Sequence, residues 1–172
     1  PTRRSSDLNQ LRRTLRDMAI SSGISAEEEP RGLPGFGQGG GDLLLHNFRD
    51  NKPTMADVTV VSEHKQASLE HAANVSGYAA TQAEAAKVET YGPACQQLRL
   101  EFLPMAIELD GAFGHGLKQF FRTCRDRAAN APVVDTTWSA ATYSQYWQQR
   151  ISVVLRCGTA QCCAPCCGGE PV

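Results

Sequence analysis

The six residues from Ala56 to Val61 constrain the fold of this chain more than any other stretch. Their apolar run is β-branched and continuous rather than alternating, which is typical of a strand buried on both faces. Asp57 is the exception, because a carboxylate in a buried strand is costly unless a cation, a metal ion or hydrogen bonds compensate it. A second acid, Asp42, opens the preceding apolar run. Two strands that each carry an acid indicate a metal site.

The composition limits the chain to a single core. Its 172 residues, 41% of them hydrophobic, suffice for one domain and not for two. A formal net charge of −1 gives no electrostatic case for a free-standing nucleic-acid-binding protein, whose surface is usually strongly basic. No long apolar run or signal peptide is evident, so we expect no membrane partner. The scattered Cys95, Cys124 and Cys157 suit reduced thiols in a nuclear or cytoplasmic protein.

The two ends of the chain differ from its middle. Residues 1–8, PTRRSSDL, match one translated frame of a common sequencing-adapter oligonucleotide, so we exclude this adapter-derived or disordered N-terminus from the fold. Residues 161–172 hold four cysteines within six positions. Cys163 and Cys166 have the spacing of half a zinc site or of a redox pair, but nothing completes a four-ligand set. We therefore expect a Cys-rich disordered or out-of-frame tail there, and one domain over residues 9–160.

Hydrophobic periodicity predicts a mixed α/β domain over that range. The expected order is helix, three strands, helix and strand, followed by additional C-terminal helices. A glycine-rich loop over residues 32–41 separates the first strand from a hairpin. The strands are predicted at Ile24–Glu29, Asp42–Phe48, Ala56–Val61 and Leu100–Leu109, and the helices at Leu8–Ser22, Gln66–Tyr91, Gly116–Ala129 and Thr136–Arg156.

The predicted hairpin raises a geometric difficulty. A polar turn over Arg49–Pro53 makes its strands antiparallel, and in a simple hairpin the two strand starts lie at opposite ends. Asp42 and Asp57 then converge only if the register is offset or the sheet is bent. Pro104 cannot donate a ladder hydrogen bond, so the last strand is expected at an edge or with a bulge. Lys87 lies on the inner stripe of the long helix, where its ammonium either points towards Asp57 or extends into water.

Four motifs occur in order along residues 9–160: ADVTVV, AAKVETY, LEFLPMAIELDGAFG and QQRISVVLRCGTA. Together they resemble the C-terminal region of reverse-transcriptase polyproteins of non-LTR retrotransposons. That region is similar to the restriction-like endonuclease domain of the PD-(D/E)xK superfamily, whose core order is helix, three strands, helix and strand. The resemblance implies a restriction-endonuclease-like mixed sheet and an endonuclease that nicks target DNA for insertion. The implied partners are DNA, RNA and the reverse-transcriptase domain of the parent polypeptide.

The resemblance also assigns site residues. The family's acid after a proline falls on Asp42, where this chain has Gly-Gly-Asp, and its second acid falls on Asp57. The family's lysine, displaced from the strand to the following helix, falls on Lys87, and its tyrosine falls on Tyr91. A glutamate on or just after the first helix corresponds to one of residues 27–29, and Glu29 before the proline fits best.

These residue types suit phosphodiester hydrolysis. The reaction needs an activated water and neutralisation of developing negative charge, which Mg²⁺ supplies when oxygen ligands and the substrate phosphate hold it. The expected Mg²⁺ ligands are Asp42, Asp57 and Glu29, and Lys87 is expected to assist the water or the transition state. Contacts to backbone phosphates are expected from the basic residues Lys118, Arg122 and Arg125.

A second interpretation of the same residues remains open. Asp42 would then cap a turn and Asp57 would pair with a cation at a strand end, since structural ion pairs imitate active sites. Thr59 stands where simpler family members place a strand lysine, and Thr90 stands where this branch often has a second lysine. These departures leave a catalytically inactive, degenerate structural or DNA-binding remnant as the alternative function.

Overall fold

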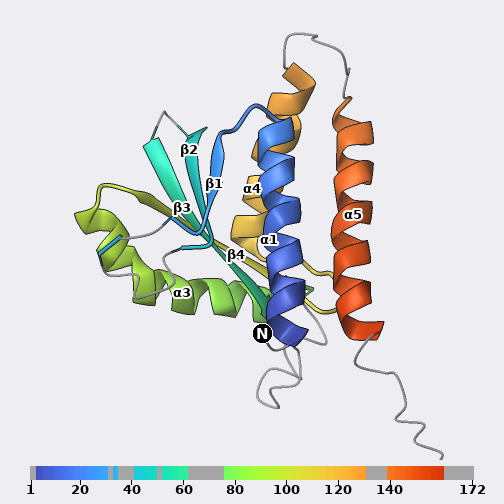
Figure 1. The fold of residues 1–172 in the computed structure, drawn as a ribbon, viewed down its shortest axis with the longest axis horizontal. Helices are drawn as coiled ribbons and strands as arrows, with labels where there is room; N and C mark the ends of the chain where they lie inside the picture. Colours follow the sequence, from blue (N-terminus) through green and yellow to red (C-terminus); the bar gives the residue numbers. More distant parts are fainter. Residues whose placement is uncertain are drawn as a thin grey trace, which may run out of the picture.

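The chain forms a mixed α/β fold in which four helices surround a four-stranded sheet in the part of the chain that the structure describes (Figure 1). The structure is a computed structural model and describes residues 3–30, 33–34, 41–49, 52–61, 76–130 and 139–160. Its elements are α1 (Arg3–Ser21), β1 (Ala26–Glu28), β2 (Leu43–Arg49), β3 (Lys52–Val61), α3 (Tyr78–Gln97), β4 (Glu101–Glu108), α4 (His115–Asn130) and α5 (Ala140–Ala160).

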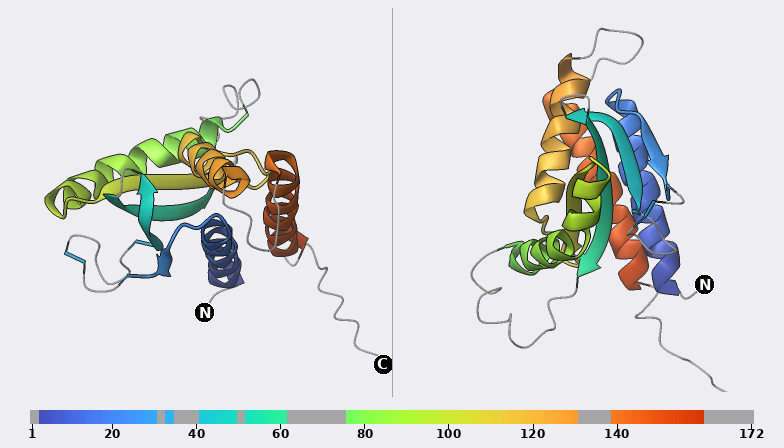
Figure 2. Two further views of the ribbon diagram at one scale, coloured as in Figure 1. Left: turned by 90° about the horizontal axis from the view of Figure 1, so that it is seen from above. Right: turned by 90° about the vertical axis from the view of Figure 1, so that its left-hand side faces the viewer.

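The sheet has the strand order β1-β2-β3-β4. The β1–β2 and β2–β3 pairs are antiparallel, whereas the β3–β4 pair is parallel. The predicted interior position of β3 is therefore confirmed, and Val58 is only 4% exposed. The edge position that Pro104 predicted for β4 is confirmed too. Helix α1 covers one face of the sheet and α3 covers the other (Figure 2).

Alternation along the strands divides the apolar side chains between these two faces. The larger cluster lies between the sheet and helices α1, α4 and α5, and the smaller cluster lies under α3. Full burial of each large aliphatic or aromatic side chain contributes about 1.5–3 kcal/mol, so the larger cluster dominates the stability of the domain. Its most buried large members include Leu11, Leu15, Met18, Leu43, Leu45, Phe48, Ile107, Phe120 and Tyr143.

Strand β3 starts earlier than predicted. It begins at Lys52 rather than at Ala56, so Pro53 lies in the strand and not in a turn. The ladder between β2 and β3 is irregular between Leu45 and Arg49, which is where a proline without an N–H is tolerated. The longer strand places Asp57 in the middle of β3 rather than near its start.

Helix α3 also differs from its predicted range. Residues 62–75 lie outside the described part of the chain, so the predicted start at Gln66 cannot be compared. Gly77 forms a turn with φ +84°, and α3 begins at Tyr78. A Cβ at Gly77 would lie 2.6 Å from the Phe113 carbonyl oxygen, which explains the glycine. At the other end, α3 continues through the exposed Pro93, where the freed backbone carbonyl can bind water.

The remaining boundaries agree within a few residues except at the chain ends. Helix α1 begins at Arg3, five residues before the predicted Leu8. The expected tail over residues 161–172 lies outside the described residues, as does the predicted start of the last helix at Thr136. None of the described helices is long and apolar enough to cross a membrane.

A buried glutamate fixes three elements against one another. Glu84 on α3 is 5% exposed, and its carboxylate accepts hydrogen bonds from the backbone N–H groups of Ala106 (3.0 Å), Gly116 (2.9 Å) and Leu117 (3.4 Å). The last two belong to the first turn of α4, where N–H groups lack helical partners and a negative charge is favourable. Gly116 allows α4 to lie this close to β4, because a Cβ there would collide with the Pro104 carbonyl oxygen.

We predict that Glu84→Ala lowers the free energy of unfolding by about 3 kcal/mol or more, because each buried N–H left unpaired costs about 1–3 kcal/mol. Urea denaturation measures the change. The matched control is Glu89→Ala, an exposed glutamate on the same helix, which should stay within about 0.5 kcal/mol of the parent. Equal losses in the two variants would contradict the structural role of Glu84.

Candidate active site

Asp42 and Asp57 lie opposite each other on adjacent strands. Leu43 pairs with Ala56 in the antiparallel ladder, which brings the preceding Asp42 level with Asp57. The Asp42 N–H donates to the Ala56 carbonyl at 3.0 Å, so the ladder extends to this residue. The geometric difficulty disappears because β3 begins at Lys52. Asp57 is then halfway along β3, level with the start of β2, and the two predicted acids come together.

Asp42 is held by one helix and one strand. Its Oδ2 accepts the Val58 N–H at 2.6 Å, and its Oδ1 accepts a hydrogen bond from the Arg12 guanidinium at 3.0 Å. Burial raises the pKa of Asp42, and the negative charge of Asp57 raises it further, although the Val58 and Arg12 hydrogen bonds oppose the rise. The net upward shift means that burial and the neighbouring carboxylate outweigh the two hydrogen bonds.

Asp57 receives its cation from the opposite face of the sheet. Its Oδ2 lies 2.9 Å from the Lys87 ammonium and also accepts the Thr59 hydroxyl at 3.2 Å. Of the two orientations considered for Lys87, the one towards Asp57 is therefore observed. The Lys87 ammonium also lies 5.2 Å from the centre of the Tyr91 ring, one helical turn further along α3. Asp57 Oδ1 forms no hydrogen bond with a described residue.

Arg12 is the residue of the site that sequence reasoning missed. One guanidinium nitrogen binds Asp42, and the other lies 2.6 Å from Glu29 Oε1. The Glu29 N–H donates to the Asp42 carbonyl at 3.0 Å, but the Glu29 carboxylate contacts Arg12, and its side chain is 49% exposed. Arg12 stands among other basic residues on the polar side of a predicted amphipathic helix, and no sequence signal separates it from Arg13 or Arg16.

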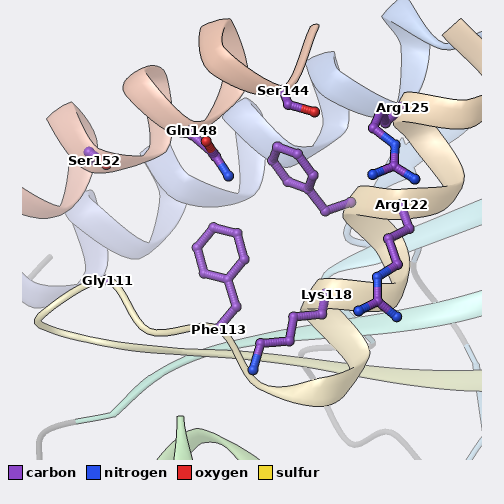
Figure 3. A pocket seen from close by; sticks show the side chains of 9 residues that line it. Gly111, Phe113, Lys118, Arg122, Arg125, Ser144, Gln148 and Ser152 are labelled. Carbon is purple, nitrogen blue, oxygen red and sulfur yellow. The ribbon is translucent and has the colours of Figure 1, made fainter. Parts of the chain in front are cut away.

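The three predicted phosphate-binding residues come together at a different place. Lys118, Arg122 and Arg125 line a cleft of about 570 Å³ between α4 and α5 (Figure 3). Neither aspartate lines this cleft. The cleft-lining Phe113 pairs with Ile107, which lies beside Val60, three residues beyond Asp57. At about 3.3 Å per residue, the cleft begins roughly 10 Å from Asp57 along the strand direction and lies beyond the edge strand β4.

The donor set of the two aspartates fits Mg²⁺. Within the described ranges, no three His, Cys, Asp or Glu side chains group closely enough to form a closed metal site. Mg²⁺, however, is usually bound through one or two carboxylates, with waters and substrate phosphates completing its coordination. Asp42 and Asp57 supply that number of carboxylates on adjacent strands.

A comparison of the chain with models of known protein families found no match, and neither did a comparison with curated proteins. A functional proposal therefore depends on the geometry of the site and on the motif resemblance described above.

We predict that Asp42→Asn becomes more stable relative to the parent as the pH rises. The folded protein raises the pKa of Asp42, so ionisation of this side chain reduces stability once the pH passes through its raised value. The asparagine can still accept the Val58 N–H and does not ionise. Urea denaturation between about pH 3 and pH 7 covers the relevant interval.

The control for this comparison is Asp110→Asn, because Asp110 is exposed and its side chain also accepts a backbone N–H, that of Ala112. A parent protein that gains stability relative to Asp42→Asn with rising pH would show that the carboxylate is stabilised rather than strained by its surroundings.

Proposed function

We propose that this chain is a restriction-like endonuclease domain that nicks DNA with Mg²⁺, within a reverse-transcriptase polypeptide of a non-LTR retrotransposon. The observation that carries the proposal is the 2.9 Å ion pair between Lys87 and Asp57 beside Asp42 on the adjacent strand. The order of the core elements, helix, three strands, helix and strand, also agrees with what the motif resemblance implies. The β2–β3 register, which sets Asp42 level with Asp57, supports a site shared by the two acids.

The two aspartates would hold the metal ion. Bound Mg²⁺ would lower the pKa of a water molecule and neutralise charge that develops on the phosphate. Asp57 offers Oδ1, which has no hydrogen bond from a described residue, and Asp42 offers Oδ1, whose present partner is the Arg12 guanidinium. Glu29 contacts Arg12, so its role as a third ligand stays a prediction.

Lys87 would act directly on the reacting groups. Its ammonium is oriented by Asp57 and by the face of the Tyr91 ring, and its side chain is 31% exposed, so it remains accessible to substrate. A cation in this position can donate a hydrogen bond to the attacking water or to a phosphate oxygen, where negative charge increases in the transition state. Tyr91 would position the ammonium through a cation–π contact.

The alternative proposal is a non-catalytic remnant of the same domain. It is favoured by the observation that each aspartate already has a cationic partner, Arg12 or Lys87. In that case the ion pairs would only fasten α1 and α3 to the sheet, and the Thr59 hydroxyl would occupy the place of the strand lysine beside Asp57. Cleavage activity distinguishes the two proposals.

We predict that the parent protein nicks supercoiled plasmid DNA in the presence of Mg²⁺, and that Asp57→Asn lowers the rate by at least about 100-fold because a charged metal ligand is lost. Lys87→Met should reduce the rate by a smaller factor, since a positioned cation contributes less than the ion itself. Lys52→Met, which removes an exposed lysine from the same sheet, is the matched control and should retain activity.

Two outcomes would reject the catalytic proposal. Equal nicking by the parent and Asp57→Asn would show that the cleavage arises elsewhere. An inactive parent that gains activity with Thr90→Lys would identify a decayed nuclease, in which the fold is retained and the chemistry is lost. Circular dichroism of each variant verifies that the fold is intact.

A further inference from the structure

The cleft between α4 and α5 combines three kinds of surface. Helix α4 contributes its basic side chains on one wall, and the opposite wall carries small polar side chains from successive turns of α5 (Figure 3). Two phenylalanines also line the cleft. The residues that line the cleft on these three sides are Lys118, Arg122 and Arg125, then Ser144, Gln148 and Ser152, and finally Phe113 and Phe121.

The basic wall is suited to a chain of phosphates. No acidic side chain lines the cleft, and in the described part of the chain Lys118 and Arg122 have no ion pair, whereas Arg125 binds the neighbouring Asp126 at 2.7 Å. At a rise of about 1.5 Å per residue, the helix advances roughly 10 Å from Lys118 to Arg125. A basic wall of that length can contact more than one phosphate of a strand.

The cleft also has two aromatic lining residues, Phe113 and Phe121, which the binding of phosphates alone does not require. Phe113 is only partly buried, and its ring centre lies 5.9 Å from that of the buried Phe121. Figure 3 shows the Phe113 side chain between the α4 and α5 walls. A partly exposed ring beside several cations is the arrangement on which unpaired bases stack, because every base offers a π face. Bases inside a duplex are already stacked and could not enter the cleft.

We propose that this cleft binds an unpaired nucleic-acid strand. The phosphates lie along Lys118, Arg122 and Arg125, one base stacks on the Phe113 ring, and the Gln148 amide hydrogen-bonds to a base edge. The cleft begins roughly 10 Å along the sheet from Asp57, so the bound strand lies outside the carboxylate site. This inference concerns binding only and does not depend on the proposed cleavage reaction.

The test is fluorescence anisotropy with a labelled oligo-dT strand of about 15 nucleotides, an oligo-U strand and a duplex of the same length. The buffer contains EDTA, so a failure of the cleavage proposal does not affect the result. The parent should bind a single strand at least fivefold more tightly than the duplex. Comparison of oligo-U with oligo-dT shows whether the cleft distinguishes RNA from DNA. Tighter binding of either single strand than of the duplex supports the proposal.

Variants locate the binding site. The double variant Lys118→Ala, Arg122→Ala should weaken single-strand binding at least tenfold and reduce the salt dependence by about 0.7 logarithmic units per lost contact. The control double variant Arg13→Ala, Lys52→Ala removes two exposed cations from other elements and should change affinity much less. Equal losses in the two double variants would overturn the proposal, because binding would then follow net charge alone.

A second set of variants tests base stacking. Phe113→Leu should weaken single-strand binding about fivefold while duplex binding is unchanged, and Phe113→Tyr, which keeps the ring, should restore it. Gln148→Glu should weaken single-strand binding by placing a negative charge in the cleft. Equal effects of Phe113→Leu on single strand and duplex, or competition by inorganic polyphosphate as strong as that by oligo-dT, would show a simple anion site and overturn the proposal.

Discussion

The register between β2 and β3 is the constraint on which the rest of the candidate site depends. It sets Asp42 beside Asp57, and two partly buried carboxylates at such a position repel each other. Two cations on opposite faces of the sheet compensate that negative charge: Arg12 on α1 pairs with Asp42, and Lys87 on α3 pairs with Asp57. Helices α1 and α3 therefore each form an ion pair with one of two neighbouring acids. These ion pairs connect both helices to the sheet whether or not the acids bind a metal.

Two other buried acids in the domain, Glu84 and Glu108, accept hydrogen bonds from backbone N–H groups at helix starts, which distinguishes them from the acids of the candidate site. Glu84 gives both oxygens to backbone N–H groups of β4 and α4, and Glu108 accepts the Ala80 N–H in the first turn of α3 at 3.0 Å. Both glutamates bind N–H groups at helix starts, and Glu84 uses both of its oxygens in this way. Asp57 shares a single oxygen between Lys87 and Thr59, so it retains capacity for a further cation.

Local pattern predicted much of the fold but not the contacts between layers. The continuous apolar run predicted the interior strand β3, and Pro104 predicted an edge position for β4. Both predictions depend on the preferences of residues within the strand itself. The start of β3 at Lys52 was missed because Pro53 resembles a turn residue, and only pairing with β2 shows that it lies in the strand. Arg12 was missed because its role arises from a contact across thirty residues. The basic residues of α4 were predicted to contact phosphates, but the cleft was not predicted, because the facing residues of α5 are ordinary polar side chains.

The central claim is that the space beside Asp42 and Asp57 accepts a divalent cation. The most direct measurement is paramagnetic broadening of backbone amide NMR signals on titration with Mn²⁺, a substitute for Mg²⁺ with the same preference for oxygen ligands. Our account predicts that the amides of Leu43 and Val58, which flank the two acids, broaden first and that Asp57→Asn abolishes the effect. Broadening that begins elsewhere in the chain, or that persists unchanged in Asp57→Asn, would contradict it.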